Sequence, residues 1–251
     1  MNGIVLRGRL AGPLPTAQTV GYYSPAQSIT NAAVMLAMGL RRVLISPVAV
    51  RLGRGQDVSR EIDLAMKLVV AVFCLPLLLG TSFMAPGLIA LLYGEQYGSS
   101  VSVLVIIGWA GAFQIAAMVC ESVLFSHPKH NYRDYAPGAV ISVLVNVALC
   151  VLLIRDYGAI GAAIAAVFGR LVYLGFAVHY SRRQMDGKAL RLRHFTDLAL
   201  LLVSAFGLWH LVMGWIANAW VAYCVAGALT LPLLAGFMAY QRSRMVGMSP
   251  E

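Results

Sequence analysis

The chain alternates between long apolar stretches and short polar connections. Seven of the apolar stretches are long enough to cross a bilayer as helices, which takes about 20 residues at a rise of ~1.5 Å per residue. They are continuous rather than alternating, which favours helices over barrel strands. The pattern therefore predicts an all-α polytopic membrane protein with about seven transmembrane helices. The seven predicted spans are residues 28–50, 64–83, 101–125, 137–154, 158–180, 196–216 and 219–240.

A shorter apolar segment, residues 85–93, follows the second span. Its length predicts an interfacial helix that ends at Gly94. In the fifth span, small residues recur at three- and four-residue spacing at Gly158, Gly161, Ala165 and Gly169. Such spacing predicts a face on which two helices approach each other closely.

Composition agrees with a membrane protein. Of the 251 residues, 60% are hydrophobic and 12% are charged, whereas soluble domains have roughly 45–50% apolar and about 25% charged residues. This excludes an ordinary soluble enzyme. The net charge of +9 would suggest a nucleic-acid partner in a soluble protein. In a membrane protein it is better explained by basic cytoplasmic loops, so we expect no nucleic-acid partner.

The basic residues segregate to one set of connections. Thirteen Lys and Arg residues lie in or directly beside residues 51–63, 126–136, 181–195 and the tail after 240, while the alternate connections hold only Arg155. Because Lys and Arg accumulate in cytoplasmic loops, these segments are predicted to face the cytoplasm. The sequence thus predicts a multi-pass protein of the cytoplasmic (inner) membrane with a cytoplasmic C-terminus.

Four charged residues lie more than three residues inside a predicted span: Arg41, Arg42, Arg170 and Glu121. An arginine at this depth costs a few kcal/mol unless it faces a cavity or a partner. Guanidinium groups bind phosphate oxygens bidentately, so the arginines predict a cationic substrate-binding site, with Arg170 the first candidate, Arg42 the second and Arg41 the third. The alternatives are an ion pair of Arg170 with Glu121, or arginines that extend to the interface.

Catalytic and metal-binding patterns are absent from the sequence. The four cysteines all lie in apolar runs without metal-ligand spacing, and no nucleotide-binding or hydrolase motif occurs. We therefore expect no enzyme activity, no metal and no cofactor.

Five segments resemble the Wzx-type polysaccharide flippases of the multidrug/oligosaccharidyl-lipid/polysaccharide exporter superfamily. Residues 5–13, VLRGRLAGP, are similar to the stretch that precedes the family's GYYS motif, which is present as VGYYSPA at 20–26. The other three are ISPV at 45–48 followed by Arg51, LLYGEQY at 91–97, and DYGAIGAAIA at 156–165. The last is the most distinctive.

The resemblance implies one lobe plus two extra helices of a MATE-like flippase fold, in which two six-helix lobes face a central cavity. It divides the chain into a remnant of a preceding helix and outer loop (1–27), a five-helix membrane lobe (28–180), a basic cytoplasmic loop (181–195), a helical hairpin (196–240) and a cytoplasmic tail (241–251). On this basis the chain is expected to be the carboxy-terminal half of a longer transporter. The missing amino-terminal lobe and other polysaccharide-assembly proteins are its expected partners.

The function that the resemblance implies is translocation of a polyprenyl-diphosphate-linked oligosaccharide across the membrane for polysaccharide biosynthesis. The substrate diphosphate would meet the arginines, and the prenyl tail would stay among the membrane lipids. A cation-coupled drug antiporter of the same superfamily is one alternative, although it would need acids in the cavity. A non-transporting membrane subunit of a polysaccharide-assembly complex is another.

Overall fold

The computed structural model describes residues 17–54, 58–126 and 132–184. These residues are almost wholly helical and contain no strand. The predicted spans 196–216 and 219–240, most of the basic loop and the tail lie outside the described residues. The elements are α1 (Ala17–Gly53), α2 (Ser59–Val69), the π-helical turn η1 (Val70–Cys74), α3 (Leu75–Phe83), α4 (Ala85–Tyr93), the 3-10 turn η2 (Glu95–Tyr97), α5 (Ser100–Ser126), α6 (Tyr132–Tyr157) and α7 (Ala159–Gln184).

Each of the first five predicted spans coincides with a helical region. Helix α1 is longer than its apolar stretch and begins eleven residues earlier, at Ala17. The second span is α2 and α3, joined by η1, where Leu75 N–H donates to the carbonyl of Val70. Pro76, which has no N–H to donate, is the second residue of α3. The predicted interfacial helix is α4, and Gly94 follows it with φ of 91°.

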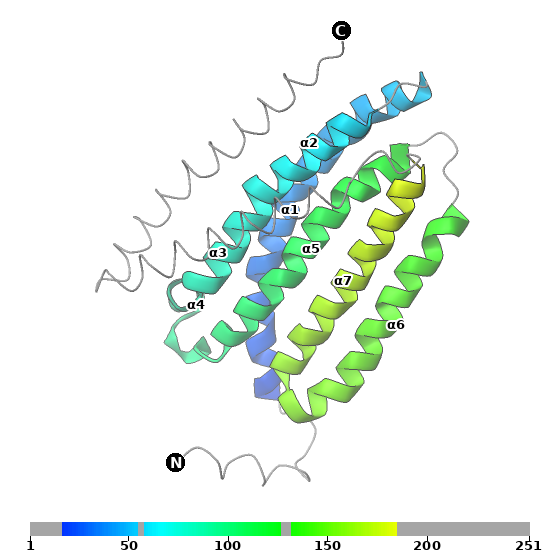
Figure 1. Cartoon of the computed structure of the whole chain (residues 1–251). Helices are drawn as coiled ribbons and strands as arrows, with labels where there is room; N and C mark the ends of the chain where they lie inside the picture. The colour runs from blue at the N-terminus through cyan, green and yellow to red at the C-terminus, as the bar shows by residue number, and fades with distance from the viewer. Residues whose placement is uncertain (1–16, 55–57, 127–131, 185–251) are drawn as a thin grey trace.

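Helix α5 lies at the centre of the bundle (Figure 1) and packs against α1, α7 and the α2–α3 region. Helices α6 and α7 form an antiparallel hairpin that turns at Gly158, whose φ of 56° suits a residue without a side chain. The predicted small-residue face of α7 is the surface packed on α6. A Cβ at Gly161 would overlap the backbone carbonyl of Leu153, and one at Gly169 would lie 2.9 Å from Cβ of Asn146.

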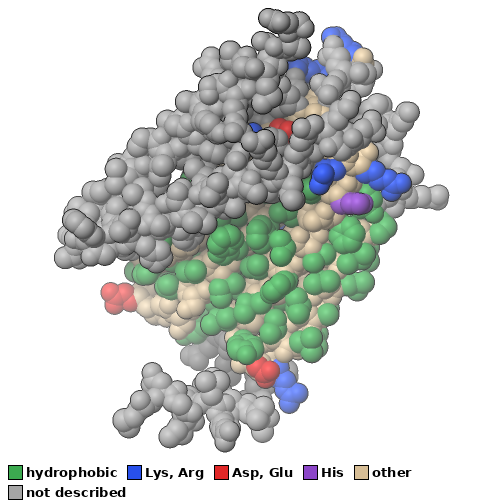
Figure 2. All heavy atoms as spheres, in the orientation of Figure 1, with side chains coloured by type: hydrophobic (Ala, Val, Ile, Leu, Met, Phe, Trp, Pro, Cys, Tyr) green, Lys and Arg blue, Asp and Glu red, His purple; other side chains and the backbone are tan. Residues whose placement is uncertain are grey.

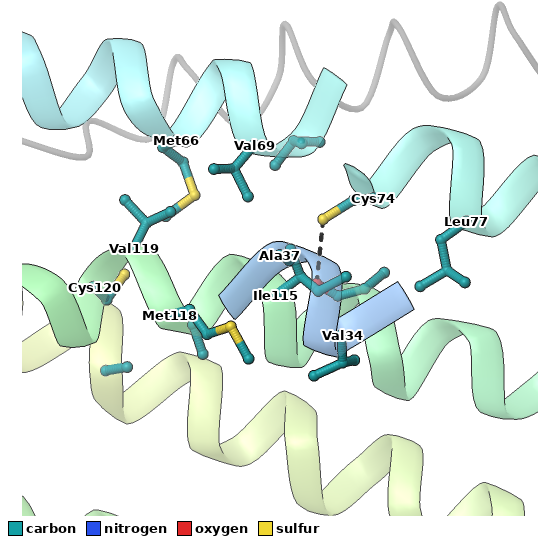
Figure 3. Close-up of a cluster of buried hydrophobic side chains, with 14 of the residues drawn as sticks. Val34, Ala37, Met66, Val69, Cys74, Leu77, Ile115, Met118, Val119 and Cys120 are labelled. Carbon is teal, nitrogen blue, oxygen red and sulfur yellow. Dashed lines mark hydrogen bonds between the residues drawn. The ribbon is translucent and has the colours of Figure 1, made fainter. Parts of the chain in front are cut away.

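The largest buried cluster joins α1, the α2–α3 region, α5 and α7 (Figure 3). Its side chains are mainly aliphatic, with Met66, Met118 and two cysteines filling gaps between them. The Cys74 thiol donates to the carbonyl of Ala112 on α5 at 3.4 Å. Cys74 and Cys120 therefore act as core residues in this cluster, as expected from their apolar surroundings.

Three helical stretches in the described part are long and apolar enough to cross a membrane: Ala65–Phe83, Ser100–Ser122 and Ala136–Arg183. The last covers most of the α6–α7 hairpin and so accounts for two passes. The outer side of α6 exposes large apolar residues, among them Leu144 and Val151. Figure 2 shows this face as hydrophobic across its middle, with charged side chains at its two ends. The protein is therefore an all-α polytopic membrane protein.

The helix directions agree with the predicted alternation of connections. The end of α1, the start of α2, the end of α5, the start of α6 and the end of α7 lie at one end of the bundle (Figure 1). We call this the basic end, because it carries Arg51, Arg54, Arg182 and Arg183. The turns after α4 and α6 lie at the opposite end.

Candidate functional site

Arg170 lies near the middle of α7, eleven residues from its first residue, or about 16 Å along the helix axis. Its side chain is exposed. Ala163 and Ala177, which are seven residues before and after it, are both fully buried. Residues seven apart lie on nearly the same helix face. Arg170 is therefore an exposed residue on a face of α7 that is buried about two turns before and after it.

Helix α1 carries a polar row that begins near this part of α7. Tyr23 packs against the same buried cluster as Ala166 and Val167 of α7, and Arg170 follows Val167 by three residues. Gln27 and Asn31 follow Tyr23 at four-residue steps and so share its side of α1. The Gln27 amide donates to the Asn31 carbonyl oxygen at 2.8 Å. Asn31 is exposed and Gln27 is half-buried, so both amides have surface available to a ligand.

Helix α6 supplies a third side. The Cys150 thiol donates to the side-chain carbonyl of Asn146 at 3.2 Å. Asn146 packs against Gly169, the residue before Arg170, where only a glycine leaves room for it. Polar side chains from three helices thus lie between the middle of the bundle and the end opposite the basic end. We call this group the Arg170 site: Tyr23, Gln27, Asn31, Asn146, Cys150 and Arg170.

Glu121 does not belong to this group. It is 9% exposed on α5 and accepts a hydrogen bond from the hydroxyl of Tyr173 on α7. Arg170 leaves α7 on a more exposed side, and the described residues show no ion pair between it and Glu121. Glu121 therefore serves the packing of α5 on α7.

Arg41 and Arg42 lie within α1, ten and eleven residues beyond Asn31. Their side chains are outside the described part of the structure, so their role stays a prediction from the sequence.

One cation in a group that otherwise holds amides, a phenol and a thiol favours an anionic ligand. Guanidinium N–H groups donate to phosphate oxygens in a bidentate manner, and the amide N–H groups can add further donors. The site residues other than Arg170 could not be assigned from composition. The four-residue spacing of Tyr23, Gln27 and Asn31 is the sequence signal that points to them.

Residues 8–102 match the family described as polysaccharide biosynthesis protein. The match covers α1 to α4 and the start of α5, including the α1 row of the Arg170 site. The chain matches no curated protein and no solved structure. The matched segment, which is helical, thus resembles a polysaccharide biosynthesis protein.

Proposed function

We propose that the protein takes part in the translocation of a polyprenyl-diphosphate-linked oligosaccharide across the cytoplasmic membrane. The Arg170 site binds the diphosphate, the prenyl chain stays among the lipids, and the sugars pass through a hydrated path beside the site. In this proposal the exposed side of the Arg170 site is completed by a second, amino-terminal lobe of the transporter, and the basic end faces the cytoplasm.

The observation that carries this proposal is the exposure of Arg170 at mid-depth between buried Ala163 and Ala177. An arginine that only stabilised the fold would be expected to pair with a carboxylate or reach the interface, because an unpaired cation in lipid is costly. Arg170 is instead about 16 Å from the start of α7, and the described residues place no carboxylate in an ion pair with it. The similarity of residues 8–102 to polysaccharide biosynthesis proteins supports the diphosphate of a lipid-linked oligosaccharide as the anion.

A cation-coupled antiporter of the same superfamily is less well supported. That chemistry uses acidic residues in the cavity, whereas Glu121 is turned into the α5–α7 interface and bonded to Tyr173. A non-transporting membrane subunit of an assembly complex would need no polar residues at mid-depth. The Arg170 site therefore favours the flippase.

Complementation of a flippase-null strain tests the proposal. The full-length gene should restore surface polysaccharide and prevent lipid-linked oligosaccharide from accumulating on the cytoplasmic leaflet. Arg170→Ala, expressed at the same level in the membrane, should restore neither. If wild-type protein leaves polysaccharide export unchanged but raises resistance to cationic drugs, the antiporter is the correct alternative.

A further inference from the structure

Three tyrosine rings pack together at the end of the bundle opposite the basic end. Tyr22 comes from α1, Tyr93 is the last residue of α4, and Tyr97 closes η2. The ring centroids of Tyr22 and Tyr97 are 6.4 Å apart with an interplanar angle of 84°, and those of Tyr93 and Tyr97 are 5.9 Å apart at 63°. All three are half-buried. This tyrosine cluster is therefore a built aromatic surface that remains accessible.

The turn that positions Tyr97 also places two polar side chains beside the cluster. Gly94 has φ of 91°, which L-residues rarely adopt, and its carbonyl accepts a hydrogen bond from the Tyr97 N–H at 3.2 Å. Between them lie Glu95 and Gln96, both exposed. The short turn thus presents a carboxylate and an amide next to the tyrosine rings.

A sugar ring fits this combination of groups. Its C–H faces are apolar and pack on aromatic rings, while its hydroxyls donate to carboxylates and both donate to and accept from amides. A purely apolar ligand would leave Glu95 and Gln96 without a role. A phosphate would be repelled by Glu95.

We propose that the tyrosine cluster, with Glu95 and Gln96, binds a sugar ring of the translocated oligosaccharide. This inference rests on the proposed function and adds a second subsite to it. Tyr22 directly precedes Tyr23 of the Arg170 site, so one helix carries residues of both subsites. The diphosphate then contacts the arginine at mid-depth, while a sugar contacts the tyrosines at the membrane surface.

Tyr157 provides a matched control. It is exposed at the α6–α7 turn, at the same end of the bundle (Figure 1), and among the described residues its ring lies outside the tyrosine cluster. Aromatic residues at membrane surfaces also serve as interfacial anchors. If anchoring were the only role of the tyrosine cluster, replacing Tyr157 or Tyr97 would have similar effects.

The test is saturation-transfer NMR on the full-length chain in lipid nanodiscs. The probe is the lipid-free oligosaccharide released by mild acid from the host's own polyprenyl-linked pool. Wild-type protein should transfer saturation to the sugar C–H protons. Tyr97→Leu should weaken binding about tenfold, whereas Tyr97→Trp and the control Tyr157→Leu should bind as wild type does.

Glu95→Gln is a second variant, since an exposed side chain can be replaced without disturbing the fold. It should weaken sugar binding about 2–10-fold, and Asp156→Asn at the same end should not. No saturation transfer to wild type, or equal effects of Tyr97→Leu and Tyr157→Leu, would overturn the sugar subsite.

Arg170→Ala separates the two proposals. It should abolish flipping while leaving binding of the lipid-free oligosaccharide intact. Sugar binding without any flipping by wild-type protein would refute the proposed function alone. Flipping that is unaffected in Tyr97→Leu and Glu95→Gln, together with unchanged sugar binding, would refute the sugar subsite alone.

Discussion

The hydroxyl of Tyr173 on α7 donates a hydrogen bond to the carboxylate of Glu121 on α5. This bond joins two neighbouring helices inside the bundle, next to the buried cluster of Figure 3. It gives Glu121, the acid within α5, a structural partner. It also leaves the arginine three residues earlier on α7 without this carboxylate as its partner, and so separates the structural acid from the ligand-binding cation.

Removal of this bond should cost stability but not function. Tyr173→Phe keeps the ring and deletes the donor, so we expect a loss of about 0.6–2 kcal/mol, the range for hydrogen bonds between membrane helices. A reversible unfolding titration in mixed micelles measures it. Flipping per folded molecule should stay within twofold of wild type. A large loss of flipping with unchanged stability would place Glu121 and Tyr173 in the transport machinery instead.

Two glycines of α7 should respond to the same substitution in opposite ways. Gly161→Ala places a methyl group on the backbone carbonyl of Leu153, which cannot move without α6, and should destabilise the hairpin by about 1–3 kcal/mol. Gly175 has no atom within 4 Å of a built Cβ. Gly175→Ala should be neutral or stabilise the helix by up to about 1 kcal/mol. Equal effects in the unfolding titration would show that α6 and α7 are not packed in this way.

Water should reach the Arg170 site but not the outer face of α6. Asn31→Cys and Leu144→Cys both introduce an exposed thiol, one in the polar row of α1 and one on the apolar face of α6. In a chain whose native cysteines are replaced by serine or alanine, a charged methanethiosulfonate should label Asn31→Cys rapidly. It should leave Leu144→Cys unlabelled, because the reagent needs water and lipid covers that face. The reverse order of labelling would be incompatible with a hydrated site.

The helices of this protein could largely be predicted from the apolar pattern. Continuous apolar runs leave only helices as spanning structures, and Gly94 marks the end of α4 because it adopts a positive φ. The start of α1 at Ala17 was not predicted, since its first residues are polar and gain stability from packing rather than from membrane burial. Tyr22, for example, is held by Tyr97, which lies 75 residues away in the chain.

The candidate site was only partly predictable, for the same physical reason. Placing an arginine within the membrane costs free energy, so an arginine in an apolar run is conspicuous. Arg170 could therefore be singled out from sequence alone. Whether it meets Glu121 or the polar row of α1 depends on how α1, α5 and α7 pack. Nothing in the sequence separates Tyr23 from Tyr97, since both are aromatic residues close to apolar runs. Their different neighbours, helix α7 for one and two tyrosine rings for the other, come from tertiary contacts.

The most direct test of the central claim is flipping of a fluorescent polyprenyl-diphosphate oligosaccharide in proteoliposomes that contain the full-length protein and any second lobe it requires. Arg155→Ala is the matched control, since Arg155 is also exposed but lies in the last turn of α6. We predict that Arg170→Ala lowers the flipping rate at least about tenfold, as expected for loss of a charge-assisted contact of about 1.4 kcal/mol or more. Arg170→Lys should keep part of the rate because it retains the charge without the bidentate geometry. Equal flipping rates for wild type, Arg170→Ala and Arg155→Ala would contradict the assignment of Arg170 to substrate binding.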